Sequence, residues 1–293
     1  MSLYYLMSVR FFVICSIILA VAACDNIDPK DSAASPAPLK MSTASASVSV
    51  LPFAFLIDGL DRQRTIRLYL PPDYTESTDS YPVLYMHDGQ NLFDAASSYA
   101  GEWGVDETLD GLAQAAKLKL IVVGIDNGGE YRMNELSPWP NKRFGEAQGK
   151  QYMDFIVEVV KPYIDTNYRT KPERQHTAIM GSSMGALISH YAIHAYPQVF
   201  SKAGLFSPSY WYSDSVFDYT QEHKVALDAR LYVMFGDEEG DGMIVDTGKM
   251  QRQLLSQGHP RELMVFKRVA GGEHNEALWR QEFADAVQWL FSE

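Results

Sequence analysis

Short apolar runs alternate with longer helical patterns along most of the chain. Seven segments have the composition of β-strands: residues 64–70, 81–86, 118–125, 177–180, 203–206, 230–235 and 262–267. Four clear helical patterns lie between or after them, at residues 148–165, 184–195, 245–256 and 275–291. This order predicts an α/β fold, with a mostly parallel sheet covered by helices on both faces.

The predicted strands differ in how they are expected to be covered. Apart from Lys119 and Thr177, residues 118–125 and 177–180 are apolar, which is typical of strands buried on both faces. Residues 64–70 alternate charged and apolar side chains, which predicts one exposed face. Neither an internal repeat nor a second domain is evident, so residues 51–293 are expected to form one domain.

Two segments precede this domain. Residues 24–50 are rich in Ser, Ala and Pro and have no amphipathic period, which predicts a flexible tether. In residues 1–23 a single basic residue, Arg10, is followed by an apolar run, which is the layout of a secretory signal peptide. That run is short for a membrane-spanning helix, which needs about 20 apolar residues.

The sequence Val-Ala-Ala-Cys at residues 21–24 resembles a bacterial lipobox, in which cleavage precedes the cysteine and the cysteine carries the lipid. The alternative is a plain signal peptide cut near Ala23, which would release a soluble secreted protein. We favour the lipoprotein, attached through Cys24 to a cell membrane on its periplasmic side.

Composition and charge exclude several classes of protein and partner. The hydrophobic content of 46% is that of a globular protein rather than a disordered one. A formal net charge of −12 would repel a polyanion, so nucleic acid is not expected as a partner. Cys15 would leave with the signal peptide, and Cys24 alone forms neither an internal disulfide nor a structural zinc site. No metal ion and no organic cofactor are expected.

A nucleophile is indicated where the strand at 177–180 meets the helix at 184–195. The intervening sequence is Gly181-Ser182-Ser183-Met184-Gly185, which matches G-x-S-x-G in a strand-turn-helix setting. The turn is so tight that side chains at the two glycine positions would collide with the strand and the helix. Ser183 would then lie at a helix N-terminus, where an anion is stabilised, whereas Ser182 has the wrong flanks.

The general base is expected after Ser183. Hydrolases with a G-x-S-x-G nucleophile between a strand and a helix place serine, acid and histidine in that order along the chain. His190 and His194 have a metal-ligand spacing on a helix but lack the glutamate of an H-E-x-x-H site, so packing or surface roles are favoured. His274 lies in a glycine-containing loop between the last strand and the last helix. That position suits a base that reaches over the strand ends, so His274 is the predicted base.

The acid is expected in the loop after the strand at 230–235. This loop carries four carboxylates, Asp237, Glu238, Glu239 and Asp241. Only one of them can reach the imidazole, and a solvated acidic turn accounts for the others. The loop lacks the ligand spacing of an EF-hand, so calcium is a minor alternative.

A series of motifs in a characteristic order extends over residues 55–290. They are YPVLYMHDGQNLFD at 81–94, EW at 102–103, GIDN at 124–127, GSSMG at 181–185, SPSYW at 207–211 and GGEHNEALW at 271–279. With these motifs the chain resembles the bacterial putative-esterase family of α/β-hydrolases, which includes esterase D, feruloyl esterases, enterochelin esterases and mycolyltransferases.

The resemblance implies a serine esterase with a Ser–acid–His triad and assigns the acid to Glu239, with Asp237 and Asp241 close enough to remain alternatives. It also implies an oxyanion hole formed by the backbone N–H groups of Gln90 and Met184. Three aromatic residues are also candidates for the pocket wall, although core packing suits their side chains equally well. They are Trp103, Tyr210 and Trp211.

The predicted function is hydrolysis of a small-molecule or glycan ester through an acyl-enzyme. An acyltransferase on the same fold and a non-catalytic binding lipoprotein are the alternatives. No stretch of the sequence selects one substrate.

Overall fold

The computed structural model describes residues 40–292. The expected signal peptide, Cys24 and most of the expected tether lie outside the described residues. In the described residues, no helix combines the length and apolar character needed to cross a membrane.

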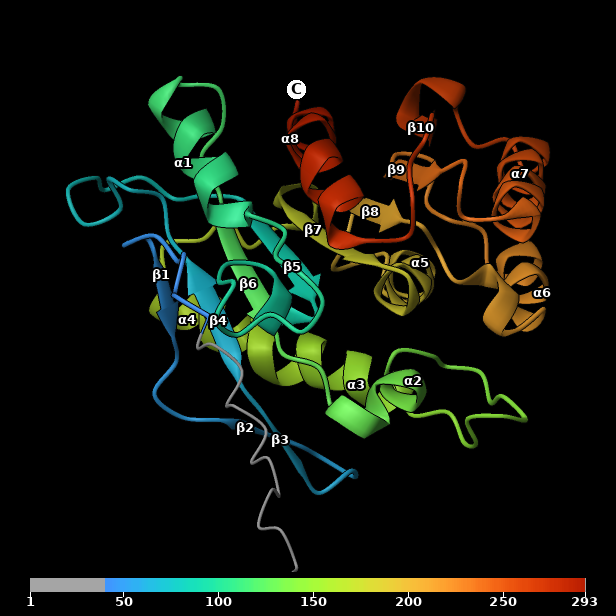
Figure 1. The fold of residues 1–293 in the computed structure, drawn as a ribbon, viewed down its shortest axis with the longest axis horizontal. Coiled ribbons are helices and arrows are strands. Elements are labelled where there is room, and N and C mark those ends of the chain that lie inside the picture. Colours follow the sequence, from blue (N-terminus) through green and yellow to red (C-terminus); the bar gives the residue numbers. More distant parts are fainter. Residues whose placement is uncertain (1–39, 293) are drawn as a thin grey trace, which may run out of the picture. The chain divides into compact units, whose positions relative to one another are not determined.

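An eight-stranded sheet occupies the centre of the domain (Figure 1), in the order β1-β4-β6-β5-β7-β8-β9-β10. The strands β5 to β10 are parallel to one another, whereas β4 is antiparallel to both β6 and β1. The predicted mostly parallel α/β sheet is therefore confirmed. The strands are β1 Val48–Val50, β4 Ile66–Tyr69, β5 Val83–His87, β6 Ile121–Ile125, β7 Thr177–Ser182, β8 Lys202–Phe206, β9 Arg230–Gly236 and β10 Met264–Val269. A separate hairpin pairs β2 Phe55–Ile57 with β3 Arg62–Arg64.

Helices cover the sheet on both faces, and each face has its own hydrophobic core. One core includes side chains of α1 Val105–Gln114 and α8 Glu276–Phe291. The other includes side chains of α3 Gly149–Phe155, α4 Lys161–Asn167, α5 Met184–Ala195, α6 Ser215–Glu222 and α7 Asp241–Ser256. A short helix, α2 Arg132–Glu135, follows β6. The predicted helix at 148–165 forms α3 and α4, joined by a π-helical turn, η3 Ile156–Val160.

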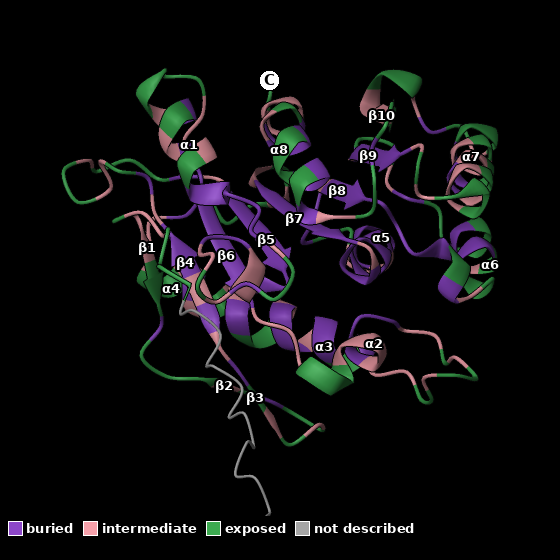
Figure 2. Ribbon diagram, in the orientation of Figure 1, coloured by how far each residue is buried: buried purple, intermediate pink, exposed green. Residues whose placement is uncertain are grey.

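The alternation of side chains along the central strands separates the two cores. In β5, Val83 and Tyr85 belong to the core under α5, whereas Leu84 and Met86 belong to the core under α8. All residues of β5, β6 and β7 are buried, as Figure 2 shows for the middle of the sheet. The strands within the segments at 118–125 and 177–180 are thus covered on both faces, as predicted.

Two expectations were wrong at the N-terminal side of the sheet. The folded part begins before residue 51, because β1 pairs with β4 inside the segment expected to be a tether. The strand region at 64–70 is also covered rather than half-exposed. Arg64 is 5% exposed and places its guanidinium 2.7 Å from both carboxylate oxygens of Glu135, and Arg67 pairs with Asp126 at 2.7 Å. A buried and a half-buried acidic partner, Glu135 and Asp126, therefore satisfy the charged positions of this strand.

Candidate active site

The predicted nucleophile lies at a strained turn. β7 ends at Ser182 and α5 begins at Met184, and Ser183 between them has φ 57° and ψ −118°. A positive φ is unfavourable for a residue with a side chain and is held only by well-packed surroundings. A Cβ on Gly181 would lie 2.8 Å from the carbonyl carbon of Gly185. The flanking glycines are thus required by the close approach of strand and helix.

Glu239 and His274 lie in contact. Nδ1 of His274 is 2.6 Å from Oε2 of Glu239. The other carboxylate oxygen, Oε1, accepts hydrogen bonds from the backbone N–H of Gly236 at 2.6 Å and from the hydroxyl of Ser207 at 2.7 Å. The Glu239 side chain is 1% exposed, whereas that of His274 is 40% exposed. A fixed, buried carboxylate therefore orients an imidazole that remains accessible.

The loops that carry these two residues meet at a pair of glycines. A Cβ on Gly236 would lie only 2.1 Å from the carbonyl oxygen of Gly272. Next to this contact, the backbone N–H of Glu238 donates to the same oxygen at 3.0 Å. Close backbone packing of the loop after β9 against the loop after β10 thus sets the distance between Glu239 and His274.

The other two candidate acids do not contact the imidazole. Oδ1 of Asp237 accepts a hydrogen bond from the backbone N–H of Gly271 at 2.7 Å, and its Oδ2 lies 3.6 Å from Arg268. Asp237 therefore supports the loop that carries His274. Asp241 is exposed and is the first residue of α7. Of the three alternatives, only Glu239 is in contact with His274.

Two serines after β8 complete the surroundings of the nucleophile and the acid. The hydroxyl oxygen of Ser209 lies 3.1 Å from that of Ser183. Ser207 donates to Glu239 and accepts a hydrogen bond from the indole N–H of Trp279 at 2.9 Å. Sequence reasoning did not assign roles to Ser207 and Ser209. The only signal was their place in the SPSYW motif directly after a buried strand.

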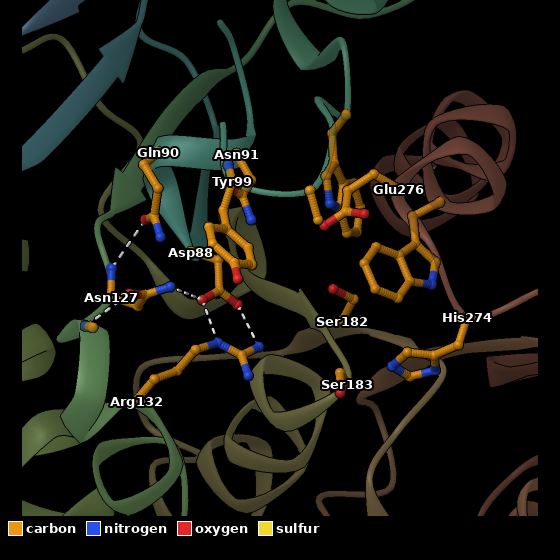
Figure 3. Close-up of a pocket in the computed structure, with 14 residues that line it drawn as sticks. Asp88, Gln90, Asn91, Tyr99, Asn127, Arg132, Ser182, Ser183, His274 and Glu276 are labelled. Atoms are coloured by element: carbon orange, nitrogen blue, oxygen red, sulfur yellow. Dashed lines mark hydrogen bonds and ion pairs between the residues drawn. The ribbon is translucent and has the colours of Figure 1, made fainter. Parts of the chain in front are cut away.

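A pocket of about 550 Å³ opens at Ser183 and His274 (Figure 3). Both residues line it, but no hydrogen bond joins them in the described structure, where Ser183 is bonded to Ser209. The lining residues are Asp88, Gln90, Asn91, Tyr99, Ala100, Trp103, Asn127, Gly129, Arg132, Ser182, Ser183, His274, Glu276 and Trp279. A pocket of this size holds a small-molecule ligand.

The aromatic candidates for the pocket wall fall into two groups. Trp103 lines the pocket and stacks on Phe206 with ring centroids 5.2 Å apart. Tyr210 is not among the lining residues; it is 1% exposed, and its hydroxyl lies 3.1 Å from Nδ1 of His190. Trp211 is 58% exposed and also lies outside the lining. The structure therefore places Tyr210 in the core and Trp211 on the surface.

The loop after β5 carries Gln90, one of the two predicted oxyanion donors. Asp88 has φ 56°, and Arg132 holds its carboxylate with two hydrogen bonds of 2.6 and 2.9 Å. The side-chain amide of Asn127 donates to the same carboxylate at 2.6 Å, while its backbone N–H donates to the side chain of Gln90. The other predicted donor, Met184, is the first residue of α5, where a backbone N–H has no acceptor within the helix.

Three other histidines of the domain are enclosed. His87 lies beside this loop, where its Nδ1 is 2.8 Å from the hydroxyl of Tyr152, and burial lowers its pKa to about 4. His190 is completely buried, with Nε2 2.8 Å from the hydroxyl of Thr220, and burial lowers its pKa well below the ordinary value. Burial also lowers the pKa of His194 to about 4. These residues are neutral packing groups at neutral pH.

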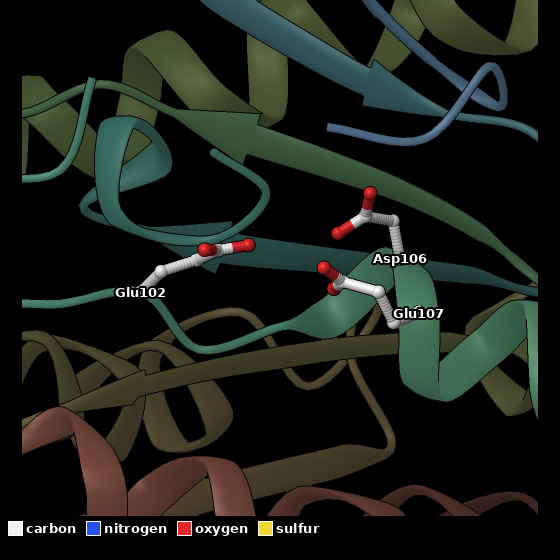
Figure 4. A group of neighbouring side chains, drawn as sticks. All are labelled: Glu102, Asp106 and Glu107. Carbon is white, nitrogen blue, oxygen red and sulfur yellow. The ribbon is translucent and has the colours of Figure 1, made fainter. Parts of the chain in front are cut away.

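A cluster of three carboxylates lies away from Ser183 and His274. Glu102, Asp106 and Glu107 have carboxylate oxygens within 4.8 Å of one another (Figure 4). Protein groups already contact two of them: Ser45 N–H donates to Asp106 at 2.7 Å, and the hydroxyl of Thr43 donates to Glu102 at 2.8 Å. These bonds attach the chain before β1 to the start of α1, and a group of acids by itself does not define a metal site.

Comparison with known proteins identifies the class. The family model described as "Putative esterase" matches residues 57–290. The described fold is that of the α/β-hydrolase esterases, and the chain is a carboxylic-ester hydrolase. It belongs to the Putative esterase family, as its motifs predicted.

Among individual relatives, the chain is 29% identical over 242 residues to the uncharacterized protein YbbA of Bacillus subtilis, covering 78% of this chain and 92% of that protein. It is 26% identical to the iron(III) enterobactin esterase of Dickeya dadantii, covering 80% of this chain and 53% of that protein. The match to an endo-1,4-beta-xylanase/feruloyl esterase of Xylanibacter ruminicola is 23% identical and spans 81% of this chain but 30% of that protein.

Solved structures share the fold at lower identity. The BES protein from Bacillus cereus superposes with a TM-score of 0.69 at 17% identity, covering 87% of this chain and 98% of that one. The enterobactin esterase FES from Shigella flexneri gives 0.68 at 18% identity, covering 85% of this chain and 59% of that one. These similarities concern the fold.

Proposed function

We propose that the chain is a serine esterase that hydrolyses carboxylic esters through an acyl-enzyme formed on Ser183. The observation that carries this proposal is the 2.6 Å contact between Glu239 and His274 beside the pocket that Ser183 lines. A buried carboxylate on Nδ1 leaves Nε2 of the imidazole free to accept a proton, which is the arrangement that activates a serine hydroxyl.

In the proposed reaction, the Ser183 hydroxyl turns from Ser209 toward His274 and attacks the ester carbonyl. His274 takes the hydroxyl proton and gives it to the leaving alcohol oxygen. The backbone N–H groups of Gln90 and Met184 stabilise the oxyanion, each contributing about 3 kcal/mol to the transition state. Water, deprotonated by His274, then attacks the acyl-enzyme. The bond from the acyl carbon to Ser183 Oγ breaks, His274 returns the proton to that oxygen, and the acid is released. No step requires a metal ion or an organic cofactor.

A fluorophosphonate probe tests the nucleophile directly, because an activated serine displaces its fluoride and becomes phosphonylated. We expect one equivalent of probe on the tryptic peptide containing Ser183, identified by mass spectrometry, and no labelling of heat-unfolded protein. Labelling of another residue would contradict the assignment of Ser183. An absence of labelling in enzyme that hydrolyses butyrate esters would contradict it as well.

Acyl transfer is the alternative reaction of the same acyl-enzyme. Product analysis after incubation with an ester and a sugar or glycerol acceptor separates the two reactions. A hydrolase yields free acid in the presence of either acceptor, whereas an acyltransferase yields a new ester in preference to the acid.

We also propose that Cys24 carries a lipid, which would hold the enzyme at the periplasmic side of a cell membrane. The supporting observation is the lipobox-like sequence at residues 21–24. In a bacterial host, Cys24→Ser is expected to abolish incorporation of radiolabelled palmitate and to move the protein from the membrane to the soluble fraction. Cys15→Ser is the matched control and should still be labelled; equal labelling of both variants and the parent would refute the proposal.

A further inference from the structure

The pocket contains one carboxylate that the proposed reaction does not use. Glu276 lines the pocket, and Figure 3 shows its side chain among the residues around Ser183 and His274. The residue is only 8% exposed. Among the residues that the structure describes, no other residue makes a hydrogen bond or ion pair with its carboxylate. Within the described residues, its one donor is its own backbone N–H. A largely buried carboxylate with so little compensation is costly, so its presence needs an explanation.

Its position at the start of α8 explains the charge only in part. Glu276 is the first residue of the helix, where the helix dipole favours a negative charge. That preference is met equally well by a carboxylate in solvent. Here the side chain instead packs against Gly101, whose added Cβ would lie 3.2 Å from that of Glu276, and it faces the pocket. The dipole therefore does not account for its enclosure.

The charges of the pocket compensate Glu276 only in part. The only other lining carboxylate, Asp88, is held by two nitrogens of Arg132 at 2.6 and 2.9 Å, so these two charges cancel. His274 is paired with Glu239 behind it. Burial raises the pKa of Glu276 and the nearby charge of Asp88 adds to this effect, whereas His274 and Arg132, which make no ion pair with it, oppose it. The pocket thus offers a ligand a carboxylate that no cation of the described residues contacts directly.

We propose that Glu276 determines specificity by accepting a hydrogen bond from a hydroxyl or ammonium group of the ester, and that it disfavours anionic esters. This inference rests on the proposed esterase reaction at Ser183. Hydroxyl and ammonium groups share the chemistry that a buried carboxylate recognises, whereas a carboxylate on the substrate would be placed beside a like charge.

The test compares four esters that differ only in one terminal group: pentyl butyrate, its 5-hydroxy and 5-amino analogues, and 5-butyryloxypentanoate. Methyl hexanoate, its 6-hydroxy and 6-amino analogues, and monomethyl adipate repeat the series on the acyl side. Hydrolysis is followed by titration at about pH 7.5, above the ordinary carboxyl range. The hydroxyl and amino arms distinguish the two donors, and the two series distinguish the side of the ester that Glu276 contacts.

In Glu276→Gln, the kcat/KM of a hydroxy or amino ester relative to the plain ester is expected to fall about tenfold or more, in at least one series. The corresponding ratio for the anionic ester is expected to rise. Because each result is a ratio within one variant, a general loss of folded enzyme cancels. Glu273→Gln is the matched control, since Glu273 is an exposed carboxylate outside this pocket, and its ratios should equal those of the parent.

The proposal is overturned if the kcat/KM ratios of Glu276→Gln stay within about twofold of those of the parent in both ester series. That outcome is separable from failure of the esterase proposal, which would appear as an absence of plain-ester hydrolysis by the parent enzyme.

Discussion

Ser183→Ala is expected to lower kcat for p-nitrophenyl butyrate by about 10⁴-fold or more, because it removes the atom that forms the acyl-enzyme. The residual rate would come from the oxyanion hole and from substrate binding, which the substitution leaves in place. Removing one oxygen from a residue already held at φ 57° adds no new backbone strain, so the variant should unfold at the same temperature as the parent. Steady-state kinetics and a thermal melt measure the two quantities.

Ser182→Ala is the matched control for this substitution. Ser182 is the preceding residue and also lines the pocket, but it belongs to β7 and lacks the flanking glycines of the turn. We expect it to retain activity within about tenfold of the parent. Equal rates for Ser183→Ala and the parent would refute the enzyme mechanism, and a larger loss in Ser182→Ala would move the nucleophile to residue 182.

The nucleophile was predictable because its signal is local. The strand, the turn and the helix around Ser183 are contiguous, and two glycines mark the one place where strand and helix approach closely. The parallel sheet was predictable for the same reason, since each buried strand is an uninterrupted apolar run. Element boundaries moved by a few residues, and β1 was missed because its alternating Val-Ser-Val pattern lies in a Ser-rich segment.

The partners of the nucleophile depend on contacts between distant loops. Residue order narrowed the acid to one loop, but the choice of Glu239 came from the family resemblance. What selects Glu239 in the fold is the approach of Gly236 to Gly272, two positions 36 residues apart that no local pattern connects. Ser207 and Ser209 were missed for the same reason, because a small polar residue after a strand has many structural roles.

The aromatic candidates show a different limit. Tyr210 and Trp211 are adjacent and were assigned together to the pocket wall, yet one is buried against His190 and the other is exposed. Large aromatic side chains suit a core, a surface or a pocket according to the direction of the backbone, which the residue type does not encode. Of the three candidates, Trp103 alone lines the pocket, where Phe206 and Trp279 pack against it.

Glu239→Gln is expected to lower kcat by about 10³- to 10⁴-fold, an effect second only to loss of the nucleophile. Oε1 of Glu239 accepts two hydrogen bonds, from Gly236 and Ser207, so the single oxygen of a glutamine is expected to keep that position. The NH₂ group would then face Nδ1 of His274 in place of Oε2. A donor there forces Nδ1 to accept and leaves the proton on Nε2, so the imidazole cannot take the proton of Ser183.

Asp237→Asn separates this effect from a general loss of acidic charge in the loop. Its Oδ1 accepts from the backbone of Gly271, and an asparagine oxygen preserves that bond, while the 3.6 Å contact with Arg268 is half-exposed and weak. The variant should therefore keep kcat within about tenfold of the parent. Fluorophosphonate labelling rates provide a second measurement, because they report activation of Ser183 without turnover. A large loss in Asp237→Asn together with a small one in Glu239→Gln would assign the acid to Asp237, and it would require the loop to rearrange when substrate binds, since Asp237 is held by Gly271 in this structure.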